Sequence, residues 1–266
     1  MKKILIIGKR GLIGSNLSKY LKKFYIVSNI SFKNLSKYKS KIKNFNYVIN
    51  TSINKSCIEK KYNPRFDNDL KISNYINKNK TIYIFLSTRK VYKSKANIKE
   101  NDKLLPKSNY AKNKLITEKK LAHKLNNNLI ILRVSNIIGD KSEIKKIHNT
   151  FVDLFFQNTK KGFLIDNKKD YKDFISIEKF CEIIKNIIKK NLIGIFNVSI
   201  GRKIFLNDVV SWLNKFNAEK LVIVKNNSKS DNFYLNNQKL MSKIKIKNSI
   251  SDLKKYCFRI SKKRFS

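Results

Sequence analysis

The sequence of 266 residues has few of the residues that mark several classes of protein. Two prolines and seven glycines exclude a collagen-like or low-complexity chain. Cys57, Cys181 and Cys257 are far apart and lack metal-ligand spacing, so we predict inert or buried thiols, with neither disulfides nor a metal site. No apolar run approaches the ~18 residues of a membrane span, and the apolar stretch after Met1 is too short for a secretory signal. We therefore expect a cytoplasmic protein with no membrane span.

Acidic residues are also scarce, since 18 Asp and Glu stand against 60 Lys and Arg and the formal net charge is +42. Such a charge can indicate a nucleic-acid or other anionic partner. The lysines, however, lie singly or in pairs along the whole sequence, together with abundant Asn and Ile. This distribution is typical of a chain-wide compositional bias and a solvated lysine coat. We therefore expect only weak, salt-sensitive binding of nucleic acid.

Three of the few glycines follow the first apolar run of the chain. Residues 4–7 form a short apolar stretch that predicts a buried parallel strand. Glycines follow it at three-residue spacing, and a helical pattern begins among them. A strand, a glycine turn and a helix together let backbone N–H groups and a helix N-terminus bind a pyrophosphate. We predict a dinucleotide site rather than a merely tight turn, with the candidates Gly8, Arg10, Gly11, Leu12, Ile13 and Gly14.

Apolar strand patterns alternate with amphipathic helix patterns along the rest of the chain. Strands are predicted at 24–28, 47–51, 81–87, 129–134, 194–198 and 221–224. Helices are predicted at 12–22, 68–76, 108–125 and 176–189, and a further helix is predicted with Asn207 as its N-cap. This alternation predicts an α/β protein with a Rossmann-type, doubly wound parallel sheet.

The end of the second predicted strand bears on the choice of cofactor. An acidic residue that binds the ribose of NAD belongs at this position, but the sequence has Ser28, Asn29 and Ile30 there. Arg10 in the glycine turn and Lys33 beyond the strand could instead contact a 2′-phosphate. The sequence therefore favours NADP over NAD, unless these cations belong to the general lysine background.

A tyrosine and a lysine lie four residues apart on the predicted helix at 108–125. Tyr110 and Lys114 share one helix face, and Glu118 forms a further i,i+4 pair with Lys114. A free phenol has a pKa near ~10, and an ammonium group beside it favours the phenolate. Thr88 ends a central strand, where ligands bind in open α/β sheets, and could hydrogen-bond the same substrate oxygen as Tyr110. Tyr-x-x-x-Lys alone carries little information in a lysine-rich chain.

Several further motifs occur in a fixed order. They are Asn63-Pro64 with Asn68, Ser87-Thr88-x-x-Val91-Tyr92, Tyr110-x-x-x-Lys114, Leu132-Arg133-x-x-Asn136-x-x-Gly139, Lys172-Asp173-Phe174-Ile175, and Phe196-Asn197-Val198 with Gly201. Together with the glycine turn, they resemble the extended short-chain dehydrogenase/reductase family over nearly the whole chain. The resemblance is to its branch of nucleotide-sugar epimerases, dehydratases and reductases.

The resemblance implies a bound NAD or NADP that is used for hydride transfer at a sugar carbon, in polysaccharide or glycoconjugate synthesis. It implies Thr88, Tyr110 and Lys114 as catalytic residues. Besides the glycine turn, the cofactor-binding candidates are Ser28, Asn29, Thr51, Ser52, Asn68, Ser87, Tyr110 and Lys114. The substrate-binding candidates are Thr88, Asn136, Lys141 and Arg202, with Lys172 as a further cation for a nucleotide diphosphate. The family also makes a homodimer possible.

Departures from the family pattern narrow the expected reaction. Related dehydratases carry an acidic pair after the Ser/Thr, whereas this chain has Arg89-Lys90, which argues against 4,6-dehydration. We expect a reductase or an epimerase. The alternative is a non-catalytic or RNA-binding member of the fold. Because the chain is shorter than most members, we expect a small, trimmed C-terminal substrate lobe, formed by 141–172 and 201–266. The dinucleotide-binding domain is expected at 1–140, with 173–200 returning to it.

Overall fold

The computed structural model describes residues 1–140, 150–167, 169–226 and 231–266. The described chain divides into two compact units. The first unit comprises Met1–Lys93, Glu100–Val134 and Cys181–Asn197, and the second comprises Ser94–Lys99, Ser135–Phe180 and Val198–Ser266. The ranges 94–99, 135–140, 173–180 and 198–200 thus group with the second unit, whereas the predicted domains had placed them in the first.

The first unit is built around one six-stranded sheet with the order β10–β5–β4–β3–β1–β2. The strands are β1 (Lys3–Ile7), β2 (Ile26–Ile30), β3 (Tyr47–Asn50), β4 (Ile82–Thr88), β5 (Leu129–Val134) and β10 (Gly194–Val198). The pairs β1–β2, β1–β3, β3–β4 and β4–β5 are all parallel. The predicted Rossmann-type sheet is confirmed. The strand order reverses at β1, so the crevice between the ends of β1 and β3 is the place where such folds bind ligands.

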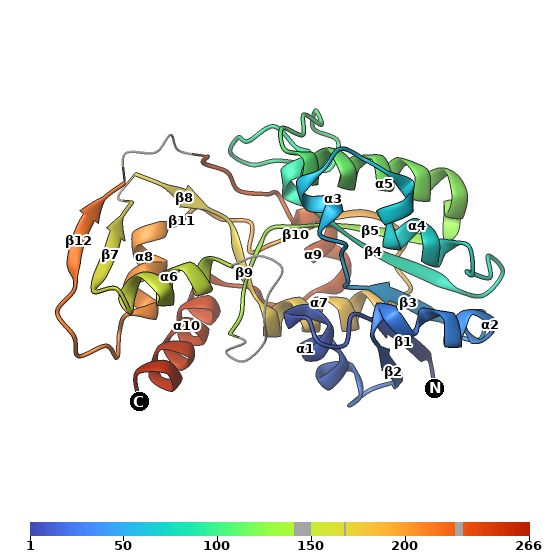
Figure 1. Ribbon diagram of the computed structural model, residues 1–266, viewed down its shortest axis with the longest axis horizontal. Helices are drawn as coiled ribbons and strands as arrows, with labels where there is room; N and C mark the ends of the chain where they lie inside the picture. The colour runs from blue at the N-terminus through green and yellow to red at the C-terminus, as the bar shows by residue number, and fades with distance from the viewer. Residues whose placement is uncertain (141–149, 168, 227–230) are drawn as a thin grey trace. The chain divides into compact units, whose positions relative to one another are not determined.

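Helices cover both faces of this sheet (Figure 1). One face carries α3 (Ser56–Glu59), α4 (Asn68–Ser73) and α5 (Asn109–Leu125), and the other carries α1 (Leu12–Leu21) and α7 (Ile177–Lys190). Leu5 and Ile7 belong to the core cluster that includes Ile72 of α4 and Leu121 of α5. Because successive strand side chains point to opposite faces, the equally buried Ile4 and Ile6 face the other layer. This two-sided burial explains why β1 is apolar without alternation.

Short helical turns complete the first unit. They are η1 (Phe32–Tyr38), α2 (Lys39–Ile42), η2 (Pro64–Phe66), η3 (Arg89–Val91) and η4 (Asn126–Asn128). Two of these turns lie close to the candidate site. Asn63 caps η2 by accepting the N–H of Arg65, and Thr88 caps η3 by accepting the N–H of Lys90. These caps fix the chain just before α4 and just after β4.

Among its described residues, the second unit contains three pairs of short strands. They are β6 (Asn136–Ile138) with β9 (Phe174–Ser176), β7 (Phe163–Asp166) with β12 (Val222–Lys225), and β8 (Tyr171–Lys172) with β11 (Ile204–Phe205). The first two pairs are parallel and the third is antiparallel. Its helices are α6 (Phe151–Thr159), α8 (Leu206–Leu213), α9 (Gln238–Ile244) and α10 (Ile250–Phe265). None of the helices in the described ranges is long and apolar enough to cross a membrane.

Three predicted element boundaries are wrong. The helix predicted at 68–76 ends at Ser73, because the N–H groups of Tyr75 and Ile76 bond to the carbonyl oxygens three residues back rather than four. The second strand was predicted at 24–28 but runs from Ile26 to Ile30, because its register is set by parallel pairing with β1. The apolar ring of Phe24 that suggested an earlier start is 41% exposed and packs against Tyr20 instead. Asn207 does not cap α8, which begins at Leu206. Its side chain instead joins α8 to the end of β7, where it donates to Asp166 at 2.7 Å.

Candidate active site

The glycine turn after β1 has three glycines with different structural roles. Gly8 has φ +121°, and a Cβ atom there would lie 2.2 Å from Thr51 Oγ1. A Cβ atom at Gly14 would lie 2.2 Å from the carbonyl oxygen of Gly8, where α1 crosses the turn. A Cβ atom at Gly11 would meet only the Gly8 carbonyl oxygen, at an ordinary 3.6 Å. The fold therefore requires glycine at positions 8 and 14, whereas Gly11 exposes its backbone to open space.

This arrangement fits a dinucleotide pyrophosphate. Gly11 is the N-cap of α1 and has no side-chain cap, and the first turn of α1 contains no acidic residue. The first N–H groups of a helix have no intrahelical partner, so those of Leu12 and Ile13 are placed to donate to an anion. Thr51 connects the end of β3 to the end of β1, because its N–H donates to the Ile7 carbonyl oxygen at 2.7 Å. The residues present therefore fit the group that the sequence predicted.

The candidates for the ribose end of this site lie within β2. Ser28 and Asn29 pair in register with Leu5 and Ile6, so they are inside the strand rather than after it. Asn29 donates from Nδ2 to the Gly14 carbonyl oxygen at 3.3 Å, and thereby joins β2 to α1. Arg10 is exposed in the glycine turn.

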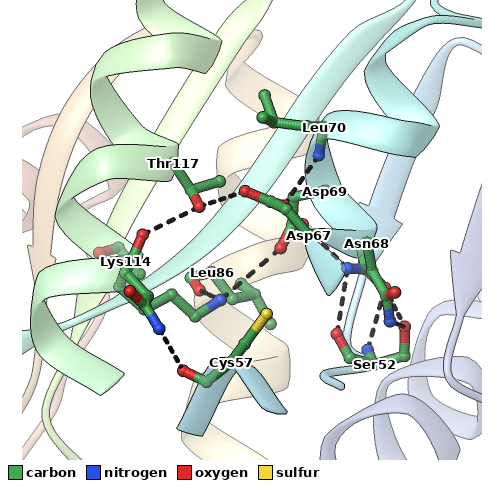
Figure 2. Close-up of polar contacts among 12 residues, drawn as sticks. Ser52, Cys57, Asp67, Asn68, Asp69, Leu70, Leu86, Lys114 and Thr117 are labelled. Carbon is green, nitrogen blue, oxygen red and sulfur yellow. Dashed lines mark hydrogen bonds and ion pairs between the residues drawn. The ribbon is translucent and has the colours of Figure 1, made fainter. Parts of the chain in front are cut away.

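A polar layer lies directly after β3 and leads away from the glycine turn. Asn50 accepts the Ser52 N–H at 3.0 Å and the Ser52 hydroxyl at 2.7 Å. Asn68, at the start of α4, donates to Ser52 Oγ at 3.2 Å (Figure 2). Three side chains from two segments thus fix one another. The predicted candidates Ser52 and Asn68 come together here, whereas Asn50 was not predicted.

The three predicted catalytic residues lie on β4 and α5, two elements that pack against each other. Thr88 is the last residue of β4 and is buried, and the turn that follows it packs against α5. Ser108 caps α5, which places Tyr110 in the first helical turn, half-buried. The Lys90 Nζ atom lies 6.0 Å from the centroid of the Tyr110 ring. Lys114 lies one turn further along α5 and interacts electrostatically with Tyr110.

Most of the Lys114 side chain is buried, and 13% of it is exposed. Its Nζ atom donates to the Leu86 carbonyl oxygen at 2.9 Å and lies 3.7 Å from Asp69 Oδ2 (Figure 2). Burial opposes the charge of this ammonium group, but Asp69, together with Tyr110 and Asp67, outweighs that effect and raises the pKa of Lys114. The group is therefore a cation at neutral pH even though little water reaches it.

Ser87, a predicted cofactor contact, lies in a different network. It is buried and donates to Glu118 Oε1. Glu118 also forms a buried ion pair with Arg133 of β5, at 2.7 Å between Oε2 and Nη2. Glu118 therefore forms its ion pair with the sheet, and not with Lys114, which lies four residues earlier on the same helix. The Arg133 guanidinium group also donates from Nη1 to the Tyr92 hydroxyl oxygen at 2.9 Å, so this network connects α5 to the sheet.

Two buried acids that sequence reasoning missed are Asp67 and Asp69. Asp67 caps α4 by accepting the Leu70 N–H at 3.0 Å, and it also accepts the Thr117 hydroxyl at 2.6 Å (Figure 2). Asp69 accepts hydrogen bonds from Asn50 and Tyr83. The only signal in the sequence was the pair of acids around Asn68, which by itself suggests an exposed helix start.

Apart from Thr88, the substrate candidates belong to the second unit or fall outside the described residues. Asn136 donates from Nδ2 to the Asp173 carbonyl oxygen at 3.2 Å, and Lys172 lies in β8. Arg202 is exposed and lines a polar cavity together with Lys99, Tyr234 and Asn248. Lys141 lies in the range 141–149, outside the described residues.

Among the residues that the structure describes, no cluster of three or more His, Cys, Asp or Glu could hold a metal ion. Cys181 and Cys257 are buried thiols, and Cys57 is half-buried and donates to the Phe66 carbonyl oxygen at 3.0 Å. Burial raises the pKa of the Cys57 thiol, an effect that Asp67 reinforces, which keeps this group in its unreactive form.

Comparison with solved structures identifies proteins of the same fold. UDP-N-acetylglucosamine 4-epimerase from Methanobrevibacter ruminantium M1, in complex with UDP-N-acetylmuramic acid, has a TM-score of 0.78 and 19% identity, over 98% of this chain and 97% of that chain. A dTDP-4-dehydrorhamnose reductase from Clostridium acetobutylicum has a TM-score of 0.76 and 20% identity, over 96% and 98% of the two chains. RMD from Pseudomonas aeruginosa, complexed with NADPH, has a TM-score of 0.76 and 16% identity, over 98% of each chain.

Comparison with protein sequences gives a family but no individual relative. No curated protein matches the chain significantly. The family model described as the RmlD substrate binding domain matches residues 1–168. Because this match covers well over half of the sequence, the chain belongs to the RmlD substrate binding domain family.

Proposed function

We propose that the chain is an NAD(P)-dependent oxidoreductase that reduces or epimerises a nucleotide sugar. The observation that carries this proposal is the buried ammonium group of Lys114 beside Tyr110, at the carboxyl end of β4. It lies in the same compact unit as the glycine turn. The solved relatives of this fold are nucleotide-sugar epimerases, dehydratases and reductases, and some of them hold NAD or NADPH.

The nicotinamide cofactor would supply the hydride acceptor and donor. Tyr110 would take a proton from a sugar hydroxyl, or return it to a carbonyl oxygen, through its phenol oxygen. The positive charge of Lys114 favours the phenolate form that the first of these steps requires. Thr88 would hydrogen-bond the same sugar oxygen and so fix it within reach of Tyr110. Ser52 and Asn68 would line the crevice that leads back to the glycine turn.

The cofactor is proposed to be NADP. Arg10 lies in the turn that would hold the pyrophosphate, and β2 presents no acidic side chain for a free ribose hydroxyl. Asn136 and Arg202 of the second unit would contact the nucleotide sugar. A cytoplasmic location and a homodimer are part of the same proposal, and gel filtration with light scattering would test the latter.

The test is the substitution Tyr110→Phe. It removes one hydroxyl oxygen and keeps the ring, so NADPH binding should stay within about twofold while turnover falls by at least about 100-fold, the scale of a lost general acid or base. A thermal-shift screen of UDP- and dTDP-linked sugars with NADP or NAD should first identify a substrate, because a ligand of the native state raises Tm.

Tyr20→Phe is the matched control. Tyr20 is a half-buried tyrosine at the far end of α1, and its loss should leave turnover unchanged. Wild-type rates in Tyr110→Phe would rule out the proposed role of Tyr110. A wild-type protein that binds no nicotinamide dinucleotide and turns over no nucleotide sugar would favour the non-catalytic alternative.

A further inference from the structure

Lys114 is held by a carboxylate that the proposed reaction does not itself use. Asp69 lies in the first turn of α4 and is buried. Its Oδ1 atom accepts the Tyr83 hydroxyl at 2.6 Å and the Asn50 amide at 2.9 Å. Its Oδ2 atom is left facing the Lys114 ammonium group at 3.7 Å (Figure 2). Oδ1 thus binds the donors from the sheet, and Oδ2 faces the lysine.

We propose that Asp69 is a positioning residue that acts through Lys114, fixing its ammonium group beside Tyr110. The inference deepens the proposed function and rests on it for the reaction. A lysine side chain has a flexible four-carbon stem and three donors. The Leu86 carbonyl oxygen and the Asp69 carboxylate hold the end of this stem from two sides. The Phe85 ring, with its centroid 4.6 Å from Nζ, closes a third side.

The carboxylate is itself held in one orientation. Tyr83 projects from β4, and Asn50 ends β3, so both donors come from the sheet and not from α4. Asn50 also donates to the Ser52 carbonyl oxygen at 3.1 Å, within the polar layer after β3. The carboxylate that faces Lys114 therefore rests on two central strands.

The charge balance around Lys114 depends on this contact. Burial alone can lower the pKa of a lysine by several units and make it neutral at physiological pH. The charged and titratable groups that face Lys114 are Asp69, Tyr110, Asp67 and Cys57, and they act in the opposite direction. Asp69 makes the largest of these contributions. Around Asp69, burial raises the pKa of the carboxyl group overall and Asp67 adds to this effect, while Lys114, Tyr83 and Asn50 favour the ionised form.

Without Asp69, Lys114 would lose its strongest counter-charge and one of its two polar anchors. The substitution Asp69→Asn removes the charge but nearly preserves the shape and the acceptor for Tyr83 and Asn50. We expect the titration midpoint of Lys114 to fall by about one pH unit or more, since an opposite charge at this distance shifts a pKa by roughly 1–3 units. The substitution Tyr83→Phe is the matched control, because it removes one donor to Asp69 and leaves the carboxylate in place.

The first measurement uses the cofactor-free protein labelled with [15N]lysine. The Lys114 ammonium signal is identified by its loss in Lys114→Met. In the wild type we expect the Lys114 titration midpoint to lie above the usual 10.5. In Asp69→Asn this midpoint should be lower by about one pH unit or more. In Tyr83→Phe it should stay near that of the wild type. If Asp69→Asn does not fold, the wild-type titration still decides, because a midpoint at or below 10.5 would overturn the inference.

The second measurement is the pH dependence of kcat with the nucleotide sugar found by the ligand screen. We expect the loss of rate at high pH to begin about one unit or more lower in Asp69→Asn than in the wild type or Tyr83→Phe. A purely structural role would lower Tm and scale kcat down at every pH without moving either midpoint, and that result would refute the inference. A wild type without any turnover would reject the proposed function, while the NMR titration would still decide whether Asp69 governs Lys114.

Discussion

The substitution Gly11→Ala separates the folding role of the glycine turn from its proposed binding role. At Gly11 a methyl group meets only the Gly8 carbonyl oxygen at 3.6 Å, and the backbone angles of φ −73° and ψ 156° suit any residue. Alanine is a poorer N-cap than glycine, but it lowers the entropy of the unfolded chain. We expect these effects to offset each other, so that the free energy of unfolding changes by less than about 1 kcal/mol.

The same methyl group would stand where a phosphate oxygen must come within about 2.7–3.2 Å of backbone N–H groups. Each hydrogen bond to a charged group contributes roughly 1.5–3 kcal/mol, so the loss of one bond weakens binding by about 10-fold to 100-fold. Titration of the purified protein with NADPH, followed by nucleotide fluorescence, measures this change. Urea unfolding of the same samples measures stability.

Gly14→Ala is the control for this prediction. Its methyl group would lie 2.2 Å from a backbone oxygen, so α1 must move, at a cost of about 1–3 kcal/mol or more. Gly14→Ala should therefore lose stability, whereas Gly11→Ala should lose only affinity. Wild-type affinity for NADPH in Gly11→Ala would refute the placement of the pyrophosphate at this turn. Equal destabilisation by both substitutions would refute the distinction between the two glycines.

Three further predictions follow from other contacts. Arg10→Ala should weaken NADP binding about 10-fold or more and change NAD binding much less, and equal losses in calorimetric titrations would contradict a 2′-phosphate contact. Glu118→Ala leaves the buried charge of Arg133 unpaired and should lower the free energy of unfolding by about 3–5 kcal/mol in urea, whereas Glu59→Ala, in an exposed pair, should change it by less than about 1 kcal/mol. Burial raises the pKa of Asp173 to about 7, so its stabilising effect is complete below about pH 4 and is lost as the pH rises through 7. The stability of the wild type relative to Asp173→Asn should therefore fall by up to about 4 kcal/mol between pH 4 and pH 8, and a constant difference would show that Asp173 does not titrate there.

Local patterns were sufficient to predict the sheet and the helices around the candidate site. The apolar run of β1, the spacing of the glycines and the cap at Ser108 are each encoded within a few residues. The register of β2 was not predictable in this way, because it depends on pairing with β1 and not on the apolar content of residues 24–28. The same limit applies to Asn207, whose side chain binds a strand that is about forty residues earlier in the sequence.

Charged residues with buried partners were the part of the site that sequence reasoning missed. Glu118 lies four residues after Lys114 on the same helix, yet it forms its ion pair with Arg133 from β5. In the sequence, Asp69 is indistinguishable from an ordinary polar residue at the start of a helix, where acids are common. Only the folded chain brings Tyr83 and Lys114 to it. Tertiary partners decide these roles, and single-residue patterns carry no information about them.

The steric demands at Gly8 and Gly14 also bear on how this sequence has diverged. The chain has only seven glycines, and three of them lie between positions 8 and 14. At other positions, Lys and Asn could accumulate where their side chains reached water, and Ile could accumulate where its side chain filled the core. At positions 8 and 14 that drift is stopped by collisions at 2.2 Å, whichever residue enters. A protein only 19% or 20% identical to these solved structures can in this way differ over most of its surface while positions 8 and 14 must stay glycine.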